Sequence, residues 1–172
     1  MQQLSREVFV GLGSNLGDRL SHLQRAIDEI GQLGATTVRR CSGFYETEPR
    51  FVRDQPVFLN ACVNIETGLP PRKLLGALLG IEDAMGRVRR QPNGPRIIDL
   101  DLLLYGACVI DDDDLHLPHP GLHSRAFVLV PLAEVGAQTH HPLLDQTILE
   151  LRERCPDTGW VRTFELGEAA GA

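Results

Sequence analysis

The sequence predicts an α+β fold with a ferredoxin-like β-α-β-β-α-β core and a C-terminal extension of short strands and helices. Short runs of β-branched and apolar residues, typical of strands, alternate with two segments in which leucine and isoleucine recur at helical spacing. These segments follow one another in the order of the split β-α-β arrangement. We therefore expect a single domain over residues 1–172, with its core at about 7–135 and the extension at 136–172.

The first half of the core contains three strands and a helix. Residues 7–12 form an apolar strand, and apolar residues at helical spacing within 20–30 predict the first helix. A second strand is expected at 36–47 and a third at 58–67, because both are rich in strand-forming residues. The polar residues 48–56 between them predict a long loop.

The second half continues with a helix that begins at Pro70-Pro71 and ends near Gly86. An arginine-rich loop and an apolar strand around Asp99 and Asp101 follow. The extension is less regular, with a short strand at 108–110, a helical or partly strand-like segment at 126–135, a helix at 147–154 and a last strand at 161–166.

Composition narrows the class of protein. The chain has 172 residues, of which 42% are hydrophobic and 23% charged, so a folded globular domain is expected. Its formal net charge of −6 argues against a nucleic-acid-binding protein, which carries a basic face. The four cysteines are scattered, and neither a signal peptide nor a membrane-spanning stretch is evident. We expect a cytoplasmic monomer without nucleic-acid or membrane partners.

Two aspartates carry the strongest chemical signal. Asp99 and Asp101 lie two residues apart in an apolar strand, so their side chains share one face. Paired carboxylates suit Mg²⁺, which binds to one or two protein carboxylates and to substrate phosphates. Four arginines lie close by in the sequence and can bind phosphate, namely Arg87, Arg89, Arg90 and Arg96. The alternative is a structural network of ion pairs at a strand edge.

Other motifs have weaker signals. The glycine-rich turn at 11–15 resembles a phosphate cradle, but a helix cap by Ser14 or Asn15 explains it better. Phe58 and Asn60 share a strand face that can bind a flat heterocycle, although core packing is the favoured interpretation.

The segment 117–127 combines histidines, an arginine and prolines. His119 and Arg125 can act as fixed cations on phosphate oxygens, or the segment is a rigid surface loop before a helix. The four aspartates at 111–114 predict a solvated turn, because adjacent side chains point in different directions.

Together, these motifs resemble the 6-hydroxymethyl-7,8-dihydropterin pyrophosphokinase family of folate biosynthesis. The matching segments run in the family's order from about residue 8 to 135, at 11–18, 44–49, 54–60, 81–82 with 86–89, 94–101, 117–120 and 125–132. The resemblance implies that pyrophosphate passes from ATP, the co-substrate, to the hydroxymethyl group of 6-hydroxymethyl-7,8-dihydropterin, leaving AMP. It also implies two Mg²⁺ ions, held by Asp99 and Asp101.

The resemblance assigns further roles by position. The implied catalytic residues are Arg87, Arg96, Asp99, Asp101 and Arg125. The implied ATP-binding residues are Arg87, Arg89, Arg96, Leu102, His119 and Arg125. The implied pterin-binding residues are Thr47, Glu48, Pro49, Phe58, Asn60 and Phe127.

The chain departs from the family's pattern in two places. Asn93 stands where some members carry a tryptophan that closes over the pterin, so the aromatic lid is missing or is supplied by Phe51. Asp114 and His116 occupy positions that contact the nucleotide in some relatives, which leaves the adenine contacts open.

Two rival functions remain at this point. A ferredoxin-like RNA-binding module needs exposed aromatic residues and a basic sheet, whereas this chain is acidic. A pterin or nucleotide sensor without activity would share the binding residues but would not turn over.

Overall fold

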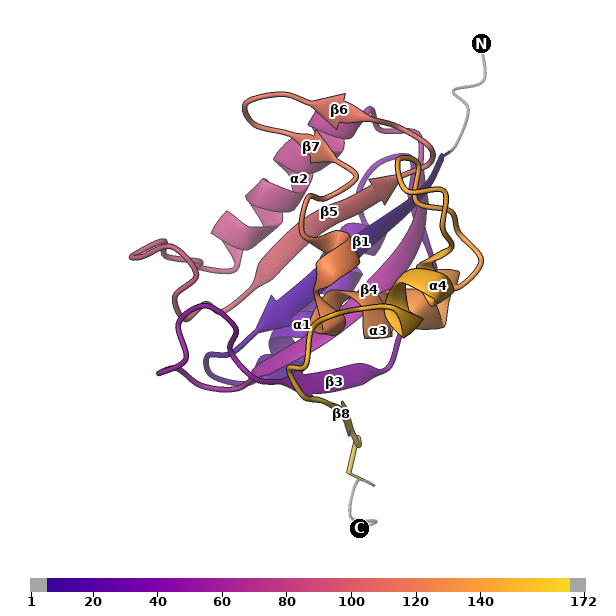
Figure 1. Ribbon diagram of the computed structural model, residues 1–172. Coiled ribbons are helices and arrows are strands. Elements are labelled where there is room, and N and C mark those ends of the chain that lie inside the picture. Colours follow the sequence, from indigo (N-terminus) through magenta and orange to yellow (C-terminus); the bar gives the residue numbers. More distant parts are fainter. Residues whose placement is uncertain (1–5, 168–172) are drawn as a thin grey trace.

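A computed structural model describes residues 6–167 as one mixed α/β domain built around an antiparallel sheet (Figure 1). Residues 1–5 and 168–172, which include part of the N-terminal sequence and the end of the predicted extension, lie outside the described residues. The strand order is β5-β1-β4-β3-β8, and β2 also pairs with β4. The sheet strands are β1 (Arg6–Ser14), β2 (Thr36–Cys41), β3 (Phe44–Thr47), β4 (Phe58–Thr67), β5 (Asp99–Tyr105) and β8 (Val161–Phe164).

Helices lie on both faces of this sheet (Figure 1). The first face is covered by α1 (Arg19–Gly31) and α2 (Pro71–Ala84), which pack their leucine and isoleucine side chains onto β1, β4 and β5. The second face is covered only in part, by α3 (Ala126–Gly136) and α4 (Ile148–Glu153). A small hairpin of β6 (Ile110–Asp111) and β7 (His116–Leu117) precedes the short 3-10 helix η1 (Leu122–Ser124).

Most of the predicted elements form near the expected bounds. The predicted strand at 36–47 is divided into β2 and β3, which both pair with β4 and are separated by an interruption at Ser42-Gly43. The segment at 126–135 is a helix, and the short strand expected at 108–110 begins only at Ile110.

The prediction that Ser14 or Asn15 caps the first helix is wrong. Gly17 has a φ of +66°, and Asp18 is the N-cap, with its carboxylate accepting a hydrogen bond from the Ser21 amide at 3.1 Å. Asn15 instead joins two loops. Its side chain donates to Gln55 and to the Pro56 carbonyl oxygen and accepts from the Arg96 amide.

No helix within residues 6–167 is long and apolar enough to cross a membrane.

Candidate active site

A cavity of about 580 Å³ opens on the second face of the sheet, next to the N-terminal end of α3. Its floor is formed by side chains of β4 and β5 on either side of β1. Along β1, Gly13 lies between Asn60 and Asp99, and Gly11 lies between Cys62 and Asp101. A Cβ atom at Gly13 would lie 2.9 Å from the Asn60 Oδ1 atom. The two glycines therefore hollow the floor, a role that local sequence motifs do not reveal.

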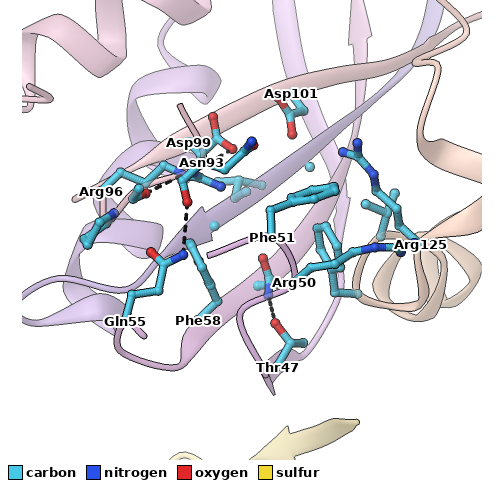
Figure 2. A pocket seen from close by; sticks show the side chains of 18 of the residues that line it. Thr47, Arg50, Phe51, Gln55, Phe58, Asn93, Arg96, Asp99, Asp101 and Arg125 are labelled. Atoms are coloured by element: carbon cyan, nitrogen blue, oxygen red, sulfur yellow. Dashed lines mark hydrogen bonds and ion pairs between the residues drawn. The ribbon is translucent and has the colours of Figure 1, made fainter. Parts of the chain in front are cut away.

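The two aspartates face this cavity in different electrostatic states (Figure 2). Asp99 accepts a hydrogen bond from Arg87 at 2.8 Å and lies 3.4 Å from the Arg96 Nε atom. Asp101 has neither a hydrogen bond nor an ion pair with any residue in 6–167. Burial, followed by the charge of Asp99, raises the pKa of Asp101 to about 7.

A divalent cation would relieve this unfavourable charge pair. No cluster of three or more His, Cys, Asp or Glu side chains able to hold a metal exists within residues 6–167. Two carboxylates alone suit Mg²⁺ when water and substrate phosphates supply the other oxygen ligands. The unpartnered Asp101 carboxylate beside Asp99 therefore fits such an ion.

Arginines line the charged side of the cavity, and Glu82 on α2 holds two of them. The Glu82 carboxylate accepts hydrogen bonds from Arg87 and Arg89, both at 2.7 Å, and from the Leu100 amide at 2.9 Å. The Nε atoms of Arg87 and Arg96 are buried and have no hydrogen-bond partner among the described residues. Both residues line the cavity with donors not used within the described chain, although these two Nε atoms are themselves buried and that of Arg96 faces Asp99.

His119 also lines the cavity, but as a neutral group rather than the fixed cation that was expected. Burial, followed by the charge of Arg125, lowers the pKa of His119 to about 4. Its Nδ1 atom accepts a hydrogen bond from the Gly121 amide at 3.1 Å. In the neutral imidazole the proton is therefore on Nε2, which can donate to a phosphate oxygen.

Aromatic rings and a side-chain amide line the opposite side of the cavity. Phe58, Asn60 and Phe127 line it, and the Asn60 side chain donates to the Thr47 hydroxyl (Figure 2). The Arg96 guanidinium lies 4.9 Å from the centre of the Phe58 ring. A flat aromatic ligand that stacks on this face of Phe58 must displace Arg96.

Twelve of the predicted site residues line this one cavity, although six segments of the chain supply them: Thr47, Glu48, Phe58, Asn60, Arg87, Arg89, Arg96, Asp99, Asp101, His119, Arg125 and Phe127. Pro49 lines a second, smaller cavity beside it. The Leu102 side chain faces away, into the core beneath α1 and α2, because it lies one residue from Asp101 on the strand. The structure therefore does not bring the Leu102 side chain to the expected ATP site.

Sequence reasoning missed several residues of the site. Glu82 lies on the buried face of α2 with Leu74 and Leu78. A carboxylate at a position where the helical spacing predicts an apolar residue could have indicated its role from the sequence. Gln55 donates to the Val52 and Asn93 carbonyl oxygens and so joins the loops at 48–57 and 87–98 (Figure 2). No sequence pattern indicates that contact.

Known proteins are similar to this chain in sequence and in fold. A model of the 7,8-dihydro-6-hydroxymethylpterin-pyrophosphokinase family matches residues 9–137. The chain belongs to this family. The matched segment covers three quarters of the chain and contains all twelve predicted site residues that line the cavity.

Individual relatives include both separate and fused proteins. A Haemophilus influenzae 2-amino-4-hydroxy-6-hydroxymethyldihydropteridine pyrophosphokinase is 42% identical over 149 residues, which cover 87% of this chain and 92% of that protein. The Schizosaccharomyces pombe folic acid synthesis protein fol1 is 40% identical over 151 residues, covering 88% of this chain but only 21% of fol1. The chain thus spans about a fifth of that relative. The family and these relatives support pyrophosphate transfer in folate biosynthesis.

A solved structure has the same fold. The Plasmodium falciparum HPPK-DHPS A437G protein, crystallised with pteroate, superposes with a TM-score of 0.71 at 14% sequence identity. The match covers 89% of this chain and 43% of that chain. At this identity the similarity concerns the fold alone.

The structure places both segments at which this pyrophosphokinase-family chain departs from the expected pattern. The Phe51 ring lies 5.8 Å from the Arg50 guanidinium and 5.2 Å from that of Arg125 (Figure 2). An aromatic ring therefore lines the same cavity as Asn93, the position at which the resemblance led us to expect a tryptophan in some members. In the β6-β7 hairpin, Asp114 accepts a hydrogen bond from Arg72 on α2 at 2.6 Å.

We predict that His119 in the ligand-free protein stays neutral, with its proton on Nε2, down to about pH 5. The folded-state pKa of about 4 lies below the ordinary value of 6.5, so the unfolded chain binds the proton more readily. His119 should therefore reduce stability as the pH falls from about 6.5 through 4. Long-range ¹H-¹⁵N correlation spectra of the imidazole report tautomer and midpoint, and a midpoint near 6.5 would contradict the assignment.

Proposed function

We propose that this chain transfers pyrophosphate from ATP to the hydroxymethyl oxygen of 6-hydroxymethyl-7,8-dihydropterin, giving the pterin diphosphate and AMP. The hydroxyl oxygen attacks the β-phosphorus, and the bond from this phosphorus to the oxygen that leads to the α-phosphate breaks. AMP leaves with that oxygen, and the hydroxyl proton passes to water. Such a reaction needs positioned reactants and neutralised charge rather than a protein nucleophile.

One observation carries the proposal: the glycines of β1 separate an aromatic and amide side of the cavity from a side with carboxylates and arginines. Two strand spacings, about 10 Å, separate β4 from β5. A bicyclic heterocycle over Phe58 and Asn60 can thus extend its substituent across Gly11 and Gly13 toward Asp101. Phosphates held by the arginines would meet it there.

The residues have distinct proposed roles. Arg87, Arg89 and Arg96 bind phosphate oxygens, and His119 donates from Nε2. Asp99 and Asp101 would hold two Mg²⁺ ions, which neutralise phosphate charge and orient the attacking hydroxyl. Arg125 stabilises the charge that develops on the transferred group. Thr47, Glu48, Pro49, Phe58, Asn60 and Phe127 surround the pterin.

The remaining expectations belong to the same proposal. The order β5-β1-β4, with β2 beside β4, supports the ferredoxin-like arrangement of a single pyrophosphokinase domain. We expect a cytoplasmic monomer that acts without nucleic-acid or membrane partners. The RNA-binding alternative is disfavoured, since carboxylates and helices occupy the described sheet faces on which bases would stack.

The test is AMP formation from ATP and Mg²⁺, with and without 6-hydroxymethyl-7,8-dihydropterin. Pterin-dependent AMP supports the proposal. ADP as the product would identify an ordinary kinase or ATPase, and folded protein that binds pterin without turnover would favour the sensor.

Phe58→Leu should raise the pterin KM about tenfold and leave the ATP KM nearly unchanged, because ring stacking contributes roughly 1–3 kcal/mol. Phe58 is 8% exposed, and leucine retains most of its apolar packing. Initial rates over a range of each substrate provide the comparison. An unchanged pterin KM would mean that the heterocycle binds elsewhere.

A further inference from the structure

Asp157 joins three separate segments at the edge of the active-site cavity. It lies between α4 and β8, beyond the family match at 9–137, and its side chain is 13% exposed. The Oδ2 atom accepts hydrogen bonds from the Arg50 Nη1 atom at 2.8 Å and from the Ala126 amide at 3.0 Å. The Oδ1 atom accepts from the Gly159 amide at 2.9 Å. Three donors therefore converge on one carboxylate.

Two of these donors belong to segments that line the cavity. Arg50 follows Glu48 in the loop at 48–57, lines the cavity itself and also donates to the Ser124 carbonyl oxygen at 2.9 Å. Ala126 is the first residue of α3, between Arg125 and Phe127, which both line the cavity. The Arg125 side chain makes no capping hydrogen bond, so Asp157 satisfies an otherwise free amide at this helix start.

Polar contacts join the segments at this junction. A second cavity of about 360 Å³ lies at the same place, lined by Pro49, Arg53 and Trp160 among others. Two further links lie close by: a hydrogen bond from the Trp160 amide to the Glu48 carboxylate at 3.0 Å, and the pairing of Thr47 on β3 with Val161 on β8. Because this cavity lies between the loop and the start of α3, loss of the Asp157 contacts would let the two segments separate.

We propose that Asp157 is a positioning residue for pterin binding, acting through Arg50 and Ala126. It sets the separation between the loop that carries Glu48 and Arg50 and the helix start that carries Phe127. This inference rests on the proposed function and gives the C-terminal extension a role in the site.

Asp157→Asn tests the inference with little change in size. An amide has one oxygen and one NH₂ group, so in either orientation a donor faces a donor. Loss of one charge-assisted hydrogen bond corresponds to about a tenfold effect, which we expect in the pterin KM. The ATP KM should change less than about twofold, since Arg87, Arg89 and Arg96 do not contact Asp157. Any effect through Arg125, which precedes Ala126 at the same helix start, should lower kcat.

The matched control is Glu150→Ala, which removes the capping box of α4 in the same extension. Both variants are compared with the wild type by initial rates with varied pterin and varied ATP, and by thermal unfolding. A selective rise in pterin KM for Asp157→Asn alone supports positioning. Arg50→Gln repeats the test from the exposed loop if Asp157→Asn does not fold.

Other outcomes overturn the inference. They are an unchanged pterin KM, an equal rise in both KM values, or the same rise in Glu150→Ala. Absence of pterin-dependent AMP from the wild type would instead refute the proposed function, so the two failures are distinguishable.

Discussion

Replacing Asp101 by asparagine should nearly abolish turnover and at the same time stabilise the ligand-free protein at pH 8. Turnover should fall by about 10²–10³-fold or more, because the proposed metal loses a carboxylate ligand beside the transferred phosphates. Stability should rise because the ionised Asp101 is partly buried, lies near Asp99 and has no partner within residues 6–167. An amide of the same shape avoids that charge.

The pH dependence gives the stability effect its sign. The folded-state pKa of Asp101, about 7, lies above its ordinary value of 3.8, so the folded protein binds the proton more tightly than the unfolded chain. Asp101 should therefore reduce the stability of the wild type as the pH rises from about 4 through 7, a contribution that the variant lacks. We expect a gain on the order of 2 kcal/mol at pH 8, shrinking to zero toward pH 4.

Chemical denaturation without Mg²⁺ at pH 4, 6 and 8 measures this difference. Asp99→Asn is the matched control. It should lose activity too but gain no stability, because Asp99 already pairs with Arg87 and Arg96. An Asp101→Asn protein less stable than the wild type at pH 8 would show that the carboxylate has a structural partner after all.

Arg125→Ala should lower kcat by about 10²–10³-fold while raising the ATP KM much less. Arg125 makes no side-chain hydrogen bond or ion pair within the described part of the chain, and its guanidinium lies 5.2 Å from the centre of the Phe51 ring. Burial lowers the pKa of this guanidinium. Because the Arg125 guanidinium near Asp101 has no hydrogen-bond or ion-pair partner among the described residues, it is free to stabilise the negative charge that develops on the transferred phosphates.

Gly121→Ala examines the same role without removing the guanidinium. A Cβ atom at Gly121 would lie 2.4 Å from the Arg125 Cζ atom, so the arginine must move. We expect a fall in kcat of roughly tenfold or more from the displacement alone. Arg39→Ala, on the exposed strand β2, should leave the rates unchanged. An equal loss of kcat and ATP affinity in Arg125→Ala would assign Arg125 to ground-state binding.

Much of the fold and most of the site could be predicted because they depend on local spacing. Alternation along β5 orients Asp99 and Asp101 to one face, and the same rule places Phe58 and Asn60 together on β4. The arginines at 87–96 lie close to the aspartates in sequence, so proximity required little folding. The resemblance then supplied the distant His119, Arg125 and Phe127.

Predictions failed where the outcome depended on which segments meet. The sequence predicts that Ser14 or Asn15 caps a helix, but the helix starts later. The side-chain amide of Asn15 instead bridges Gln55 and Arg96. The side chain of Leu102, which the resemblance places among the ATP-binding residues, lies in the core, and its role stays a prediction. The contact between Asp157 and Arg50 spans 107 residues and leaves no periodic trace in the sequence.

The sequence by itself determined the element types, the paired carboxylates, the arginine cluster and the family, because each depends on residues near one another in the chain. Only the tertiary structure decided that Gly11 and Gly13 hollow the floor between Asn60, Cys62 and the two aspartates. It also decided that Asp99 is paired while Asp101 is not. The physical reason is that strand register and burial, which determine charge pairing and open space, arise only when distant segments pack together.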